Sequence, residues 1–190
     1  SINKGSYTVE ISAISRNTEY NFRYEGPLTI DTSITPSENM LMVTEGNATY
    51  WDQNQWKDVI ISGVSKYTII VMDPEDNTLA YLELIDAPGK KLEHLTGEYS
   101  VRSGSTSEGT IVAGSVFWGT ASGSFYTVDG KQRYITSGKI KISRTTDNEN
   151  YYFSLTGSNL STTTADGSTA SGTMQMKHMR RCYLSLQNLQ

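Results

Sequence analysis

Short runs in which apolar and polar residues alternate recur along the chain and predict β-strands. In the segment 6–12, Tyr7, Val9 and Ile11 lie on one face and polar side chains on the other. The clearest further runs are residues 19–24, 67–72, 79–85 and 138–143. Gly, Asn, Asp and Ser interrupt the runs about every eight to twelve residues, a spacing typical of antiparallel all-β domains.

Turn-forming residues between the runs predict hairpins. Asp73-Pro74-Glu75-Asp76 separates 67–72 from 79–85, and a proline in the second position presets φ for a type I turn. Near the end of the chain, Asp166-Gly167 supplies the pair that favours positive φ in tight hairpins. A closing strand is therefore expected around residues 173–179.

Two stretches, residues 7–63 and 67–138, share a sequence pattern and predict an internal duplication. Tyr-Thr-Val at residues 7–9 recurs as Tyr-Thr-Ile at residues 67–69, a spacing of sixty. A C-terminal hairpin segment follows at residues 139–179. Chance similarity between β-rich segments of biased composition is the alternative to a true repeat.

The expected fold is a single all-β domain over residues 1–190. Two amphipathic units bury their apolar faces most simply by stacking, so we expect an antiparallel β-sandwich built from duplicated hairpin units. The alternative is a lipocalin-like β-barrel, for which Thr96-Gly97-Glu98-Tyr99 resembles a strand start. The Gly-x-Trp start expected near the N-terminus of such barrels is missing.

Composition and charge narrow the classes of function. The 190 residues are 36% hydrophobic, 10% aromatic and 19% charged, with a formal net charge of -4. The aromatic content is too high for a disordered chain. The acidic balance argues against capture of nucleic acid or of an anionic bilayer. The apolar runs fall short of the roughly 20 residues that a membrane-spanning helix needs, so no transmembrane segment is expected.

Enzyme signatures are scarce, so we predict no catalytic residue and lean away from an enzyme. The histidines are His94 and His178, and no nucleophile-elbow glycine pattern is present. Cys182 stands beside Arg181 but is interpreted as a small buried hydrophobe. A hydrolase using two carboxylates is left open, because the sequence cannot choose a pair among twenty acids.

No metal or cofactor is expected. The sequence has no cluster of Cys and His at zinc-ligand spacing. Asp73 to Asn77 is similar to the opening of a calcium loop, but Thr78 replaces the glycine at the sixth position and Leu84 the glutamate at the twelfth. We interpret this segment as an acidic turn.

Aromatic residues in polar, turn-like contexts are the candidate ligand-binding residues. Flat rings beside amide and hydroxyl groups suit sugars, which present C–H groups to an aromatic face and hydroxyls to polar side chains. Core or edge packing of the same rings is the alternative. The predicted site consists of Trp51, Trp56, Trp118, Tyr50, Tyr126 and Asn54.

Four short segments carry a resemblance to a known group of proteins: Leu95–Tyr99, Ile135–Ser143, Tyr152–Leu155 and Asp166-Gly167. In these the chain resembles exported β-rich lipoproteins and surface proteins of gut Bacteroidetes that have no assigned function. The resemblance implies a bacterial cell-surface or periplasmic location and a glycan or adhesion role. It carries over no site residue.

These observations rank three hypotheses. The first is a non-catalytic surface binding module, with a carbohydrate as the expected ligand. The second is a structural or adhesive domain that engages protein through an exposed strand edge. The third is the carboxylate-dependent hydrolase. Because the chain starts at Ser1 without a leader, we expect an N-terminal leader that was either removed or left out of the sequence. The resemblance implies a lipid anchor attached through a removed leader.

Overall fold

The computed structural model describes residues 6–15, 18–27, 38–75, 77–147 and 150–181. Contacts divide the chain into two units, residues 1–35 and residues 36–190. In the first unit, β1 (Ser6–Ser15) and β2 (Thr18–Pro27) pair antiparallel over their full lengths and contain the two strands expected there. The single domain expected for residues 1–190 stays a prediction.

The described residues of the second unit form strands and one short 3₁₀ helix. These elements are β3 (Met40–Asp52), β4 (Lys57–Met72), β5 (Thr78–Asp86), η1 (Leu92–His94), β6 (Gly97–Arg102), β7 (Thr110–Val112), β8 (Ser115–Phe117), β9 (Thr120–Ser122), β10 (Phe125–Val128), β11 (Lys131–Asp147), β12 (Asn150–Thr163) and β13 (Thr169–Arg181). The described part of the chain has no helix with the length and apolar character needed to traverse a membrane.

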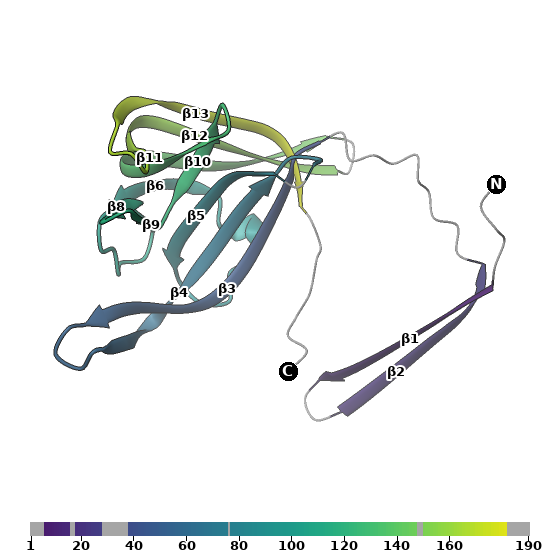
Figure 1. Ribbon diagram of the computed structural model, residues 1–190. Helices are drawn as coiled ribbons and strands as arrows, with labels where there is room; N and C mark the ends of the chain where they lie inside the picture. Colours follow the sequence, from purple (N-terminus) through teal and green to yellow (C-terminus); the bar gives the residue numbers. More distant parts are fainter. Residues whose placement is uncertain (1–5, 16–17, 28–37, 76, 148–149, 182–190) are drawn as a thin grey trace. The chain divides into compact units, whose positions relative to one another are not determined.

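The strand pairings of the second unit close on themselves (Figure 1). β5 pairs with both β7 and β10, and β11 pairs with both β6 and β10. Because β6 and β7 also pair, the strands β5, β7, β6, β11 and β10 make a closed five-membered ring. A wider circuit continues from β11 through β12, β13, β3 and β4 back to β5.

The all-β prediction is confirmed, and five strands close into a barrel in place of the expected sandwich. This barrel also differs from the lipocalin-like alternative, because lipocalin barrels have eight up-and-down strands, whereas here β6 and β7 pair parallel. A sandwich of two stacked sheets would end in separate edges, whereas here hydrogen-bonded neighbours follow one another around a ring. The expected hairpin of residues 67–72 and 79–85 lies within β4 and β5, with Ile69 opposite Leu82. β4 also runs without interruption across residues 63–67, where the two predicted repeats would meet. The repeats stay a prediction.

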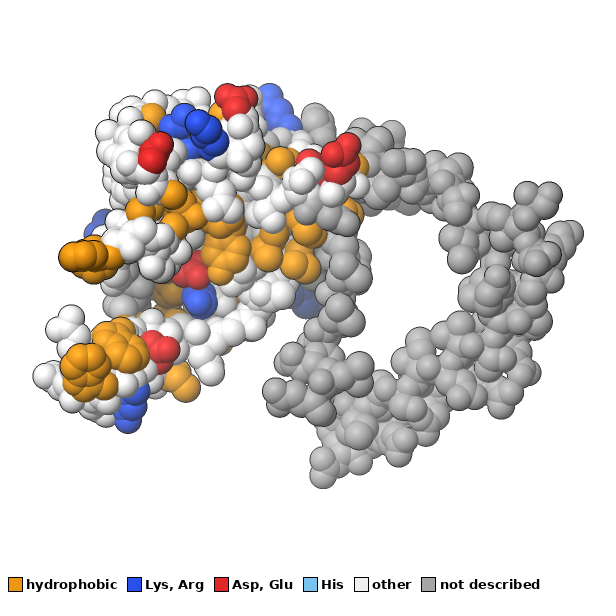
Figure 2. Space-filling view, in the orientation of Figure 1, with side chains coloured by type: hydrophobic (Ala, Val, Ile, Leu, Met, Phe, Trp, Pro, Cys, Tyr) orange, Lys and Arg blue, Asp and Glu red, His pale blue; other side chains and the backbone are white. Residues whose placement is uncertain are grey.

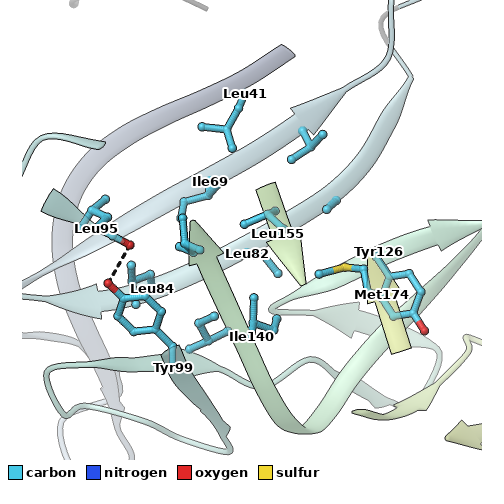
Figure 3. Close-up of a cluster of buried hydrophobic side chains, with 14 of the residues drawn as sticks. Leu41, Ile69, Leu82, Leu84, Leu95, Tyr99, Tyr126, Ile140, Leu155 and Met174 are labelled. Atoms are coloured by element: carbon cyan, nitrogen blue, oxygen red, sulfur yellow. Dashed lines mark hydrogen bonds between the residues drawn. The ribbon is translucent and has the colours of Figure 1, made fainter. Parts of the chain in front are cut away.

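Alternate side chains of the strands fill the interior of the barrel. In β4 and β5, the directly opposed pair Ile69 and Leu82 is completely buried, and so is Ile140 of β11. Figure 3 shows these side chains converging with Leu41 and Leu155 from other strands. Burying each such side chain contributes roughly 1.5–3 kcal/mol, so the interior of the barrel holds the fold together.

Buried hydroxyl groups tie the segment around η1 to the barrel. The Tyr99 hydroxyl donates a hydrogen bond of 2.8 Å to the Leu95 carbonyl (Figure 3). Burial, with a smaller contribution from the negative charge of Asp86, raises the pKa of Tyr99 to about 12. Tyr67 donates to the Ala87 carbonyl at 2.7 Å and accepts from the Lys90 backbone N–H at 2.8 Å. Each hydroxyl is therefore satisfied inside the fold.

Candidate functional site

The β3–β4 hairpin extends past the barrel as an arm, which we define as residues 49–60 and call the aromatic arm. β4 pairs with β5 only from Ser65 onward. β3 pairs with β13 only at Met40 and Leu41, the first two residues of β3. Within the described residues, the strands of the arm therefore pair only with each other, from Thr49 opposite Ile60 to Asp52 opposite Lys57. Figure 1 shows the arm projecting at the lower left.

A large bulge separates the aromatic arm from the barrel. The pairing jumps from Asn47 opposite Ser65 to Thr49 opposite Ile60, so that Ala48 alone faces residues 61–64. Gly63 in this bulge has a φ of +83°, a conformation that glycine adopts without steric cost. Bulges bend the strand that carries them, and the arm leaves the barrel at this position.

Both faces of the aromatic arm carry exposed apolar side chains. Directly opposed residues share a face, so Tyr50 lies with Val59 on one face. Trp51 lies on the other face, diagonal to Ile60. The exposed fractions of Tyr50, Trp51 and Ile60 are 46%, 53% and 61%. Neither face is covered by the rest of the described chain, which is unusual for a sheet with this many apolar side chains.

The turn at the end of the aromatic arm is held by Asp52. Its carboxylate accepts hydrogen bonds from the backbone N–H groups of Asn54 (2.8 Å) and Gln55 (3.3 Å) and from the Gln55 side chain (2.7 Å). The Asn54 N–H bond is the main cause that lowers the pKa of Asp52. Trp56 closes the turn with a φ of +51° and 80% of its side chain exposed.

A second hairpin, β8–β9, has a base that is held firmly against the barrel. The Gly114 N–H donates to the Ile135 carbonyl at 2.7 Å, and the Ile135 N–H donates to the Ser124 carbonyl at 2.9 Å. The backbones approach so closely that a Cβ on Gly114 would lie 2.3 Å from the Ser124 oxygen. The Ser124 hydroxyl also accepts from the Glu83 N–H at 3.0 Å. The position of this hairpin is therefore fixed by β5 and β11.

The tip of the β8–β9 hairpin presents another exposed tryptophan. Trp118 and Gly119 form its two-residue turn with φ values of +50° and +75°, which is the type I′ geometry. The side chain of Trp118 is 90% exposed and that of Phe117 is 73% exposed. The two rings meet edge to face, with centroids 6.2 Å apart. The tip is thus an aromatic corner in solvent.

The chain contains another turn of this geometry, formed by residue types that favour it. Asp129 and Gly130 connect β10 to β11 with φ values of +50° and +71°. Asn and Asp tolerate this left-handed conformation, whereas for other residues it costs of order 1–3 kcal/mol. Trp56 and Trp118 therefore occupy backbone positions at which tryptophan disfavours the turn.

Most of the predicted site residues lie on the two hairpins, and one does not. Tyr50, Trp51, Asn54 and Trp56 belong to the aromatic arm, and Trp118 to the β8–β9 tip. Figure 2 shows hydrophobic side chains gathered at both tips, with charged side chains beside those of the arm. Tyr126 is only 6% exposed and lies beside Met174 in the core (Figure 3). Its position in β10 directs the ring inward, so the structure does not bring Tyr126 together with the other predicted site residues.

Sequence reasoning did not include one exposed aromatic residue of the hairpins, Phe117, among the site residues. Its ring contacts that of Trp118. The alternation of side chains along the hairpin strand is the signal that finds it, once the pairing register is known.

A polar cleft of about 1010 Å³ was also missed, because three turns that are distant in sequence enclose it. Asp73, Lys131 and Asp166 each contribute from a different turn, and Tyr134 contributes part of the lining. Asp73 and Asp166 are therefore two carboxylates in the lining of one cleft, and the hydrolase hypothesis requires such a pair.

Neither carboxylate of the cleft is suited to donate a proton at neutral pH. Side-chain and backbone bonds from Asn77 lower the pKa of Asp73. Hydrogen bonds from Thr164, followed by those from Ser168, lower the pKa of Asp166 to about 2. A general acid needs a raised pKa, so each group acts as an ionised cap of its own turn.

The described residues contain no group of three or more His, Cys, Asp or Glu side chains that could hold a metal ion. In the acidic turn, Asp73 accepts from the N–H groups of Glu75 and Asn77 at 2.9 Å each. Such internal bonds are what an Asx turn requires. His94 is exposed at the end of η1, and Cys182 lies outside the described residues.

Searches of protein-family models, curated proteins and solved structures found no match to the chain.

Proposed function

We propose that this protein is a non-catalytic binding module that recognises carbohydrate through the tips of the aromatic arm and the β8–β9 hairpin. One observation carries the proposal. Trp56 and Trp118 stand at left-handed turn positions while exposing 80% and 90% of their side chains. They bury little surface for the fold and disfavour their turns, so recognition at the surface is the role that accounts for them.

Polar groups beside the rings support a sugar as the ligand. Gln53, Asn54 and Gln55 precede Trp56 in the arm turn, and all are exposed. On the second hairpin, Ser115 and Ser122 face each other next to the Phe117–Thr120 pair. A pyranose stacks its C–H face on an aromatic ring and satisfies its hydroxyls with amide and hydroxyl groups. Both tips offer this combination.

The cell-surface or periplasmic location and the lipid anchor implied by the resemblance to exported Bacteroidetes proteins form part of this proposal. Protease accessibility on intact cells of the source organism tests the location. Cleavage in intact cells indicates the surface, and cleavage only after outer-membrane permeabilisation indicates the periplasm. Protection until the cells are lysed indicates the cytoplasm and would contradict the proposed location.

The ligand test is an array of host and plant polysaccharides, followed by isothermal titration calorimetry with the oligosaccharides that bind. We expect saturable binding by the wild-type chain and a loss of at least tenfold in affinity for Trp118→Asn or Trp56→Asn. Asparagine suits the left-handed turn positions, so these variants remove the ring while keeping the hairpins folded.

A matched control separates ring stacking from general hydrophobic contact. Ile60→Thr removes an exposed apolar side chain of the same arm and keeps a β-branched residue. If the sugar binds by stacking on the rings, we expect Ile60→Thr to bind it with the same affinity as the wild type. Equal losses for Ile60→Thr and Trp56→Asn, or full binding by both tryptophan variants, would contradict the proposal.

A further inference from the structure

The outer edge of β13, residues 169–175, is an unpaired strand edge. One side of this segment pairs with β12, from Thr169 opposite Thr163 to Gln175 opposite Thr156. β3 pairs with β13 only at Arg180 and Arg181. Within the described residues, no strand follows the other side of 169–175, so its outward N–H and C=O groups are a template for a further strand.

This edge lacks the devices that usually block strand addition. Lysines, prolines and other charged residues keep natural edges from pairing, and residues 169–175 read Thr-Ala-Ser-Gly-Thr-Met-Gln. The strands of the aromatic arm differ in this respect, since Asp52, Lys57 and Asp58 lie at their ends. In the part of the chain that the structure describes, the outer backbone of residues 169–175 is therefore unpaired, and the segment carries no charged side chain.

We propose that this edge pairs with the same edge of a second copy of the chain, antiparallel and about a twofold axis at Gly172. The sequence around Gly172 is self-complementary in this register. Ser171 opposes the partner's Thr173, a hydroxyl pair that stabilises cross-strand contacts, and Ala170 opposes the partner's Met174, a small residue against a large one. No like charges oppose each other.

The geometry of the edge permits this approach. The side chains of Thr169, Ser171, Thr173 and Gln175 are exposed. A Cβ built on Gly172 meets nothing within 4 Å, so the centre of the contact is free. The same patch on both copies makes an isologous contact that closes as a dimer. The two barrels then share one continuous sheet, and the tips of the proposed carbohydrate site take no part in the contact.

Sedimentation velocity of the full chain, from 1 to about 200 µM, tests the proposal with paired charge variants. Two like-charge pairs face each other in a dimer of Ser171→Lys/Thr173→Lys, and also in a dimer of Ser171→Glu/Thr173→Glu. We expect a concentration-dependent dimer for the wild type, monomers for each variant alone and a restored dimer in their equimolar mixture. Circular dichroism and the thermal midpoint confirm that each variant is folded.

A control pair places the same charge on strands that are already paired. Ser137 on β11 and Thr156 on β12 are exposed, and Ser137→Lys/Thr156→Lys leaves the dimer intact. A wild-type chain that stays monomeric at 200 µM overturns the proposal. So does a dimer that persists in both charge variants, or a mixture of folded variants that fails to associate.

Cross-linking tests the register. In a Cys182→Ser background, Gly172→Cys places two thiols directly across the twofold axis, within the Cα separation that a disulfide spans. Ser171→Cys places them on the longer diagonal. We expect Gly172→Cys to oxidise to a linked dimer at least tenfold faster, and equal rates overturn the register. Monomeric charge variants that still bind glycan separate this proposal from the carbohydrate proposal.

Discussion

Replacing Trp118 by Asn removes the most exposed ring of the β8–β9 tip and relieves its turn. A left-handed conformation costs an ordinary L-residue about 1–2 kcal/mol, whereas Asn adopts it routinely. The ring is 90% exposed, so its removal sacrifices almost no buried area. The edge-to-face contact with Phe117 is lost, and the loss of this solvent-exposed contact offsets part of the stability gained by relieving the turn. We expect the variant to be about 0.5–1 kcal/mol more stable than the wild type.

Thermal and urea unfolding measure this difference. For a chain of this size, 1 kcal/mol shifts the thermal midpoint by about 2–4 °C, so the midpoint of Trp118→Asn rises by about 1–4 °C. The urea m-value stays the same, because the folded barrel is unchanged. A loss of more than about 1 kcal/mol would refute the reasoning, since the ring would then stabilise the fold.

The turn between β10 and β11 provides the reciprocal experiment. Asp129 has the same φ of +50° that Trp118 has, and both precede a glycine. Asp129→Trp is expected to cost about 1–2 kcal/mol, and Asp129→Asn is expected to be neutral. Opposite signs for Trp118→Asn and Asp129→Trp would show that backbone conformation, and not the individual surroundings, sets both effects.

Three further changes test other parts of the structure. Gly114→Ala puts a Cβ 2.3 Å from the Ser124 carbonyl oxygen; we expect a loss of about 1–3 kcal/mol in urea unfolding, and an unchanged midpoint would contradict the close approach. Ile140→Ala leaves a cavity in the barrel and should cost about 2–5 kcal/mol in the same assay. The pKa of Tyr99 is about 12 when folded and 10.0 in its reference state, so the unfolded state releases its proton first. The free energy of unfolding should therefore fall between pH 10 and 12, and Tyr99→Phe should make this fall with pH less steep. An equally steep fall in both proteins would count against the raised pKa of Tyr99.

Local sequence patterns anticipate the strands and many of the turns but not the closure of the barrel. Alternation marks Tyr67–Met72 and Leu79–Ile85, and their short acidic turn makes them neighbours. The ring depends instead on pairings such as Ile140 with Tyr99 and Phe125 with Tyr81, which are far apart in sequence. No local periodicity encodes which distant strands meet, so the pattern that led us to expect a sandwich is compatible with a barrel as well.

The site shows the same division between local and distant information. Polar neighbours singled out Trp51, Trp56 and Trp118 as candidate ligand-binding residues, and all three are exposed in the structure. Phe125 and Tyr126 are adjacent in one strand and point to opposite faces, and only the assembled barrel shows that Tyr126 faces the core. The polar cleft was invisible for a related reason, since its three turns become neighbours only through the sheet.

The bulge at Ala48 separates the aromatic arm from the cooperative core. Residues 49–60 pair only with one another in the described chain, so they can open while the barrel stays intact, and their amide hydrogens should exchange with solvent sooner than those of Ile69 or Leu82. The residues of the proposed binding site on the arm and those of the folding core therefore lie in different stretches of the sequence. Under the proposed function, exchange of the four turn residues, 53–56, changes the ligand of the arm without altering the stability of the barrel.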